Sequence, residues 1–328
     1  MVDFYKFFGK VPGGSILIPL FLFAIIGTIF PDLWKSLGGM SQQLFSGGAL
    51  VLSGLLMFAS GATIRLKDLP KLLKRFGSLT VAKLVFGVGL SIAFIFAFGM
   101  DGVFGINAVA FTAVMCACNP GVYASVIEEY GEPEEQGMFA IMMVLTTPAI
   151  PAAIILATGG TGGFDWVTIL TILIPFFLGL VMGNLDPKLA NMNKTMTPLI
   201  LPFLGCCFGS GLNLMQCVEA GIPGILLALF VFVVFAIVLT FTDKVINKRP
   251  GYAGAGMCTT TGSAMLVPAM LGANFAAYGS AAITQIALTL LITAILTPLL
   301  VKFIVKRSGG SERYNNLQAQ EAKELPKS

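Results

Sequence analysis

The chain contains no histidine among its 328 residues. This absence excludes imidazole as a proton carrier, as a metal ligand and as the base of a hydrolytic site. Charged residues make up only 11% of the sequence, against about 25% in soluble domains. The P-loop sequence G-x-x-x-x-G-K followed by Ser or Thr does not occur, so this chain alone holds no such ATP site. No basic cluster with interleaved aromatic residues indicates nucleic acid as a partner.

The cysteines lie in or at the ends of apolar runs, where a thiol packs as a small hydrophobe. Because neither histidine nor a Cys-x-x-Cys pair accompanies them, the sequence predicts no metal site and no cofactor. An intramembrane enzyme would need a nucleophile with its base, paired aspartates or a metal, and the apolar runs contain none of these. We therefore expect a protein that is not an enzyme. The cysteines are Cys116, Cys118, Cys206, Cys207, Cys217 and Cys258.

Long apolar runs dominate the rest of the sequence. Hydrophobic residues make up 56% of the chain, and the mean hydropathy is +0.89. Helices of about 20 apolar residues span a bilayer, so the pattern predicts an all-α polytopic membrane protein that has the lipid bilayer as a partner. Ten runs are long enough, and we number them as segments one to ten: 15–31, 45–64, 77–98, 106–127, 137–157, 167–185, 197–217, 221–242, 253–275 and 279–303.

The lysines and arginines gather on one side of this predicted arrangement. With ten crossings the termini and the even-numbered loops share a side, and all but two of the 20 basic residues fall there. The exceptions are Lys35 and Lys83, of which Lys83 lies within segment three. Since cytoplasmic loops are enriched in lysine and arginine, we expect a multi-pass protein of the cell membrane with both termini in the cytoplasm.

Two segments are interrupted where a continuous membrane helix would carry apolar side chains. Segment four contains Asn119-Pro120-Gly121, and segment nine contains the polar run 259–263. Proline removes a backbone donor, and opened backbone inside a bilayer is tolerated only where it lines a cavity or is buried in protein. A lone interruption is read as a packed proline kink. A matched pair in the two halves of a chain predicts the binding site of a secondary transporter.

The two halves of the chain also repeat in sequence. ILIP at 16–19 returns at 172–175, and the F-x-S-G pattern at 58–61 returns at 208–211. Met-Cys precedes both interruptions. Because each half has five segments, an odd number, the second copy is inserted upside down relative to the first. We therefore predict two inverted five-helix repeats, a recurring plan of secondary transporters.

Further stretches carry a family resemblance. They are VPGGSILIPLFL at 11–22, SGATIRL at 60–66, VAK at 81–83, NPGVYASVIEEYGEPEEQGMF at 119–139, GNLDPKL at 183–189 and the small polar run 254–268. Together they resemble the 2-keto-3-deoxygluconate permease family, within the bile acid/arsenite/riboflavin transporter superfamily. The resemblance covers nearly the whole chain.

The resemblance implies a bile-acid-symporter-like fold with a core domain and a panel domain. The discontinuous helices four and nine would cross within the core, near its border with the panel. The panel would comprise 1–75 and 161–218, the core would comprise 76–160 and 219–307, and 308–328 would form a disordered cytoplasmic tail.

The resemblance also implies proton-coupled symport of a small anionic sugar acid, 2-keto-3-deoxygluconate, by alternating access. Some members carry an acidic residue just before the first break, where this chain has Cys116, and this departure leaves the coupling cation open between H⁺ and Na⁺. Asn119, threonine hydroxyls and opened carbonyls are oxygen ligands that suit Na⁺. The alternative is a sodium-coupled symporter of another small organic anion, such as a keto acid.

The broken helices supply the predicted substrate site. A sugar acid offers a carboxylate, a ketone and hydroxyls, and a broken helix offers free amides at a positive dipole end. We expect residues just past each break to bind the carboxylate and nearby polar side chains to bond the ketone and hydroxyls. Helix–helix packing is the other explanation for the hydroxyl-rich run of segment nine. The predicted substrate-binding residues are Lys83, Asn119, Gly121, Val122, Tyr123, Thr259, Thr260, Thr261 and Ser263.

Lys83 is the charged residue within an apolar segment, and such a residue is a functional candidate by default. It could pair with the substrate carboxylate or change charge with a coupled proton. The alternative is that its long side chain snorkels to the membrane surface.

Acidic residues follow the first break. Glu128 and Glu129 are candidates for ion coupling, together with Lys83 and Asn119. The loop beyond them contains no basic residue, and we predict it to be a solvated acidic loop. Its acids are Glu132, Glu134 and Glu135.

Overall fold

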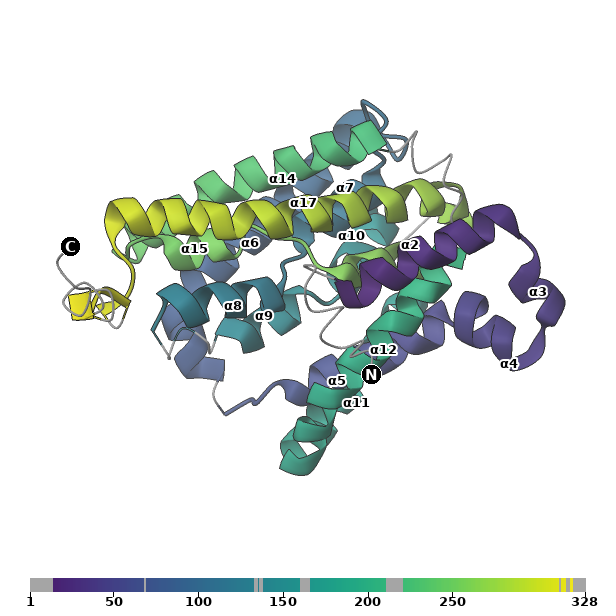
Figure 1. The fold of residues 1–328 in the computed structure, drawn as a ribbon, viewed down its shortest axis with the longest axis horizontal. Coiled ribbons are helices and arrows are strands. Elements are labelled where there is room, and N and C mark those ends of the chain that lie inside the picture. Colours follow the sequence, from purple (N-terminus) through teal and green to yellow (C-terminus); the bar gives the residue numbers. More distant parts are fainter. Residues whose placement is uncertain are drawn as a thin grey trace, which may run out of the picture.

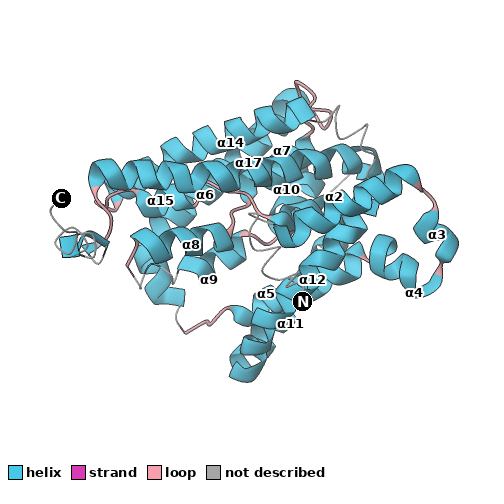
Figure 2. Cartoon of the chain, in the orientation of Figure 1, coloured by secondary structure: helices cyan, strands magenta, loops and turns pink. Residues whose placement is uncertain are grey.

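The computed structural model describes residues 14–67, 69–132, 135, 138–159, 166–210, 221–312, 314–316 and 319–320. Helices dominate this part of the chain, and one isolated bridge between Val103 and Ile106 is its only β pairing (Figure 2). The prediction of an all-α protein is confirmed.

Each predicted apolar segment contains helix over the described residues. The helices of the first half are α2 (Gly14–Ile29), α3 (Leu33–Leu37), α4 (Gly39–Gln42), the π-helix η1 (Gln43–Gly47), α5 (Ala49–Thr63), α6 (Leu69–Phe98), α7 (Ala108–Cys116), α8 (Pro120–Tyr130), α9 (Met138–Leu145) and α10 (Ala149–Thr158). Those of the second half are α11 (Trp166–Leu185), α12 (Pro187–Ser210), α14 (Gly221–Phe241), the π-helix η3 (Thr242–Ile246), α15 (Tyr252–Gly256), the 3₁₀ turn η4 (Gly262–Met265), α16 (Leu266–Met270), the 3₁₀ turn η5 (Ala273–Phe275) and α17 (Ala276–Ser308).

Three helical stretches are long and apolar enough to cross a membrane: Leu73–Phe98, Gly221–Ile246 and Ala276–Ser308. Their outward faces, and those of α2 and α11, carry large apolar side chains in contact with the surroundings. A soluble protein rarely exposes such extensive apolar surface, whereas lipid favours it. Examples of these exposed side chains are Phe21, Ile25, Val81, Val85, Ile174, Leu178, Leu229, Val233, Leu299 and Phe303.

Helices α2, α5, α11 and α12 pack against one another as one group (Figure 1). Here α2 lies along α12, and α5 lies along α11. Glycines allow these helices to approach closely. A Cβ at Gly27 of α2 would lie 2.9 Å from the carbonyl oxygen of Ser210, and one at Gly183 of α11 would overlap the carbonyl of Ala62. Small residues at such crossings are typical of helices that pack in a membrane.

The remaining long helices form a second group, in which α14 packs along α17 and α6 packs against α7 (Figure 1). Helix α7 also contacts α10 and α17, and α15 contacts α8, α14 and α17. The two groups meet where α5 touches α9 and α16, and where α10 touches α11.

Three boundaries differ from the sequence prediction. Segment five is interrupted, because α9 ends at Leu145 and α10 begins only after Pro148. Segment eight does not end at residue 242 but continues as η3 to Ile246, so that Asp243 is enclosed. The first part of the predicted disordered tail is packed: the amide of Ser311 donates to the carbonyl of Tyr130 over 2.9 Å, and Ser311 is buried.

Candidate functional site

The first interruption falls where Asn119 and Pro120 predict it. Helix α7 ends at Cys116, and α8 begins at Pro120, whose missing amide hydrogen costs nothing at the first position of a helix. Asn119 is the N-cap. Its Oδ1 accepts hydrogen bonds from the amides of Gly121 at 3.0 Å and Val122 at 3.2 Å. The free amides that the sequence predicts at this helix start are therefore held by Asn119 in this conformation.

The second interruption lies between α15 and η4, over residues 257–261. Threonines of α17 satisfy two of its opened backbone groups. The amide of Thr260 donates to Thr293 Oγ1 at 3.2 Å, and Thr297 Oγ1 donates to the carbonyl of Cys258 at 3.1 Å. Backbone groups that have no partner within a helix are thus hydrogen-bonded by side chains of α17.

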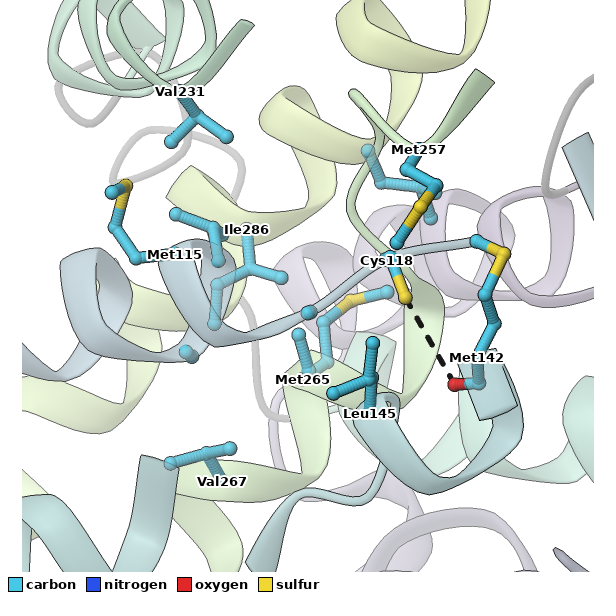
Figure 3. Close-up of a cluster of buried hydrophobic side chains, with 14 of the residues drawn as sticks. Met115, Cys118, Met142, Leu145, Val231, Met257, Met265, Val267 and Ile286 are labelled. Atoms are coloured by element: carbon cyan, nitrogen blue, oxygen red, sulfur yellow. Dashed lines mark hydrogen bonds between the residues drawn. The ribbon is translucent and has the colours of Figure 1, made fainter. Parts of the chain in front are cut away.

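The two interruptions touch each other. The amide of Asn119 donates to Thr259 Oγ1 over 2.9 Å, joining positions 140 residues apart in the chain. Figure 3 shows Cys118 close to Met257, with Met115, Met142, Met265 and Ile286 around them. Buried apolar side chains therefore surround the polar contact. Their low dielectric strengthens the hydrogen bond between Asn119 and Thr259. Both predicted interruptions are confirmed.

A small cleft of about 20 Å³ lies between the two groups of helices, and neither Asn119 nor Thr259 is among the residues that line it. Leu56 and Met57 of α5 form one wall. The other wall is formed by the interruption of segment five, 146–148, and by Ser263 and Leu266 of segment nine. Ser263 Oγ donates to the carbonyl of Thr146 at 3.0 Å, so two polar groups of the cleft lining are hydrogen-bonded to each other.

The predicted substrate-binding residues are spread over this region. Ser263 lines the cleft, whereas Thr259 and Thr260 are fully buried and do not line it. Within the described part of the chain, Thr260 Oγ1 has no hydrogen-bond partner, an uncommon state for a buried hydroxyl. Thr261 is only partly buried, as are Asn119 and Val122, and Gly121 is exposed. Binding of substrate at these residues stays a prediction.

Tyr123 points away from the cleft. It is fully buried, and its hydroxyl donates to the main-chain carbonyl of Glu135 at 3.3 Å. Tyr123 does not line the cleft, and binding of substrate by this residue stays a prediction.

Lys83 is only 1% exposed, so it does not snorkel to the surface. Its Nζ lies 3.2 Å from the ring centroid of Phe235 in α14 and has no hydrogen-bond partner among the described residues. A desolvated cation–π contact contributes about 2 kcal/mol, less than the several kcal/mol that burying an unpaired ammonium costs. Three thiols of the two interruptions, at Cys116, Cys118 and Cys258, are its electrostatic neighbours.

One acidic residue of the loop, Glu135, does not lie as predicted. Glu129 is exposed on α8, and the side chain of Glu128 is outside the described residues. Glu135, predicted to be solvated, is only 2% exposed, and Asp243 is fully buried. The prediction of a solvated loop is thus wrong for Glu135, because its side chain turns inward to meet a tyrosine.

Sequence reasoning missed several residues of the site. Thr293 and Thr297 carried a signal, since threonines recur every fourth position from Thr289 and line one face of α17. The sequence Thr-Thr-Pro at 146–148 was also visible as a break inside an apolar segment. Leu56 and Met57 carried no signal, because apolar residues on a membrane helix look alike whether they face a cleft or lipid.

The cysteines behave as predicted in the described residues. Five of them are free and buried. No group of three or more metal-ligating side chains occurs in the described part of the chain. Cys217 lies outside the described residues.

Two interrupted helices that meet inside an apolar protein, helical over its described residues, are an arrangement found in membrane transporters. Comparison with known proteins identifies the family. Residues 5–310 match the family described as 2-keto-3-deoxygluconate permease, and the chain belongs to that family. It is an integral membrane transporter and not an enzyme.

Curated relatives extend over almost the full length. The chain is 32% identical to 2-keto-3-deoxygluconate permease 1 of Salmonella typhimurium over 91% of its own length and 94% of that protein. It is 31% identical to the 2-keto-3-deoxygluconate permease of Xanthomonas euvesicatoria pv. vesicatoria, covering 91% and 96% of the two chains. It is 30% identical to that of Dickeya chrysanthemi, covering 92% and 91%.

Proposed function

We propose that this chain imports 2-keto-3-deoxygluconate together with a cation, H⁺ as the first candidate, by alternating access. The observation that carries the proposal is the contact between Asn119 and Thr259, where two interrupted helices meet, together with the cleft that Ser263 of the second interrupted helix lines. The relatives are 2-keto-3-deoxygluconate permeases, and they supply the proposed substrate. Substrate anchored at this contact would sit where the two groups of helices adjoin.

The packing supports an inverted ten-helix repeat. Segment one packs on segment seven, and segment two packs on segment six, which is the pairing that exchange of the two halves would produce. The glycine contacts follow the same exchange. Gly27 approaches Ser210, and its repeat partner Gly183 approaches Ala62, two residues further along than Ser60, the repeat partner of Ser210. In this proposal helices four and nine cross at their interruptions.

The two groups of helices correspond to the proposed domains. Helices α2, α5, α11 and α12 would form the panel, and the interrupted helices with α6, α14 and α17 would form the core. The cleft lies between them, so sliding of the core against α5 would open it to one side and then to the other. The distribution of lysine and arginine supports a cell-membrane location with both termini in the cytoplasm.

Substrate binding in this proposal exchanges internal hydrogen bonds for bonds to the sugar acid. The Ser263 hydroxyl now occupied by Thr146, and the amides of Gly121 and Val122 now occupied by Asn119, would turn to the ligand. Such exchange keeps the Ser263 hydroxyl and the two amides hydrogen-bonded in both states, and hydroxyls of the sugar acid would donate to the acceptors that they leave, which lowers the cost of releasing the substrate.

Uptake by proteoliposomes tests the function. Vesicles containing the full chain should accumulate labelled 2-keto-3-deoxygluconate when an inward proton gradient is imposed, and empty vesicles should not. Accumulation that requires an inward sodium gradient would establish Na⁺ as the coupling cation. Accumulation of another keto acid with no uptake of 2-keto-3-deoxygluconate would overturn the proposed substrate.

Lys83 gives a separate test of coupling. It lies against Phe235 and is absent from the residues that line the cleft, a position better suited to a charge change than to holding the substrate carboxylate. We expect Lys83→Met to abolish gradient-driven accumulation while unlabelled substrate inside still exchanges with labelled substrate outside. Loss of both activities would instead assign the ammonium to the substrate. The exposed Lys302→Met provides the control and should behave as wild type.

A further inference from the structure

A buried carboxylate outside the cleft joins the two interrupted helices. Glu135 Oε2 accepts a hydrogen bond from the Tyr252 hydroxyl at 2.7 Å and from the amide of Glu132 at 3.1 Å. The carbonyl oxygen of Glu135 accepts from the hydroxyl of Tyr123 at 3.3 Å. The ring of Tyr123 in turn packs on Gly256, where a Cβ would lie 3.1 Å from the ring.

The two tyrosines belong to the two discontinuous segments. Tyr123 lies one helical turn after Asn119 in α8, and Tyr252 is the first residue of α15. Glu135 therefore ties the half-helix that follows the first interruption to the half-helix that precedes the second. The tie reaches α8 one turn past the contact between Asn119 and Thr259, and it reaches α15 at the end away from that contact.

Charged groups from α6, from η3 and from the segment between η3 and α15 lie near this tie. Arg249, and Arg75 of α6, favour the ionised carboxylate, and so do the hydrogen bonds from Tyr252 and Glu132. Asp243 faces the same two tyrosines from η3. It is occupied by the amide of Gly254 at 3.2 Å and the side chain of Asn247 at 3.1 Å.

Burial outweighs these contacts and raises the pKa of Glu135 above its ordinary value. The arrangement in which Glu135 is buried therefore binds a proton more readily than one in which water reaches the carboxylate. By linkage, protonation stabilises the tied arrangement. Ionisation, as pH rises through the pKa of the buried carboxyl, favours its opening to water.

We propose that Glu135 is a proton-dependent latch between the two interrupted helices. With its carboxyl protonated, Glu135 holds α8 and α15 together. When the carboxyl loses its proton to solvent, the ionised carboxylate becomes hydrated and the two half-helices separate. Glu135 is thus a positioning residue for the crossing. The inference rests on the proposed function in placing this latch on the cytoplasmic side, where it would couple opening to proton release.

Amide hydrogen exchange of the full chain in lipid nanodiscs tests the latch without any substrate. Exchange over 120–130 and 252–256, corrected for the intrinsic effect of pH, is compared at about pH 5.5 and about pH 8. In the wild type we expect exchange on the order of tenfold faster at the higher pH. Glu135→Gln, which mimics the protonated state, should be slow at both, and the exposed Glu312→Gln should match the wild type.

Tyr252→Phe provides the second variant. In the wild type, the Tyr252 hydroxyl bonds the ionised carboxylate of Glu135 more strongly than the neutral acid, because charge-assisted hydrogen bonds are about twice as strong. We expect Tyr252→Phe to speed exchange at both pH values, because the tie loses its hydrogen bond to α15 in either state, and to do so more at the higher pH, where that bond is charge-assisted.

Exchange that does not depend on pH in the wild type, or the same pH dependence in Glu135→Gln, would overturn the latch. If Glu135→Gln does not fold, the response of Tyr252→Phe decides alone, and equal acceleration at both pH values counts against the proposal. Because no substrate enters this experiment, its failure leaves the proposed transport function intact. Failure of uptake would likewise leave the latch standing.

Discussion

At the scale of single residues, Asn119 has a structural role that its predicted binding role does not require. It caps α8 through two amides and donates its own amide to the opposite interruption. Removing an N-cap costs about 0.5–2 kcal/mol of stability. A loss of uptake on mutation could therefore arise from the cap alone, and the experiment must separate the two effects.

Asn107 offers the matched comparison. It caps α7 at the other end of the same segment, accepting from the amide of Ala110 at 2.8 Å, and it is buried. We expect Asn119→Ala and Asn107→Ala to lower the free energy of unfolding by similar amounts, about 0.5–2 kcal/mol. Uptake should be abolished by Asn119→Ala alone. Equal loss of uptake in both variants would mean that helix capping, and not contact with substrate, explains the effect.

Charge placement shows where residue-level prediction reached its limit. The sequence identified Lys83 as a functional candidate, and the structure adds its burial against Phe235. It did not reveal that Glu135 turns inward, because hydropathy describes a loop as a whole. The partner that draws Glu135 in, Tyr252, lies 117 residues further along the chain. No local pattern encodes that pairing.

At the scale of elements, the interrupted helices depend on hydroxyls from other helices. Thr259 accepts from the amide of Asn119, and it is fully buried. Thr259→Val preserves the shape but leaves that amide unpaired, which should cost about 1–3 kcal/mol. Thr259→Ser keeps the acceptor and should retain uptake. Thermal unfolding and uptake measured on both variants check this expectation.

A hydroxyl away from the interruptions provides the control. Thr158 Oγ1 donates to the carbonyl of Ile154 within its own helix, so Thr158→Val should leave uptake unchanged. If Thr259→Val transports as well as Thr259→Ser, then the contact between the two interruptions contributes packing and no essential hydrogen bond.

The elements themselves were largely predictable. Long apolar runs located the helices, and Asn119-Pro120-Gly121 and the polar run 259–263 located the two interruptions, because proline and hydropathy act locally. The third break before Pro148 was overlooked although its signal has the same chemistry. The π-helical extension past Phe241, which encloses Asp243, depends on packing against neighbouring elements and had no local signal.

At the scale of the whole molecule, two distant motifs support each other. Asn184 lies in the stretch GNLDPKL, and its side chain bonds the carbonyl of Ile64 at 2.7 Å and the amide of Leu66 at 3.0 Å, both in the stretch SGATIRL. Two of the stretches that carried the family resemblance thus meet at one end of the helix pair α5 and α11. The sequence named both but could not show that they meet.

Glycine substitutions test whether the halves are packed as equivalent copies. A Cβ at Gly183 would overlap the carbonyl of Ala62, and one at Gly27 would press on that of Ser210. We expect Gly183→Ala and Gly27→Ala each to lower the free energy of unfolding by about 1–3 kcal/mol, with the larger effect at Gly183 where the clash is closer. Gly77→Ala in α6 meets no neighbour within 4 Å and should be neutral or stabilise the helix.

Thermal unfolding of the three alanine variants in lipid, with uptake measured beside it, gives the comparison. Two crossings related by an inverted repeat bury equivalent backbone-to-backbone contacts, so a methyl group at Gly27 should separate α2 from α12 as one at Gly183 separates α11 from α5. If Gly27→Ala is as harmless as Gly77→Ala while Gly183→Ala is disruptive, the two contacts are not equivalent. The inverted arrangement proposed for this group of helices would then be incorrect, whatever the sequence repeat suggests.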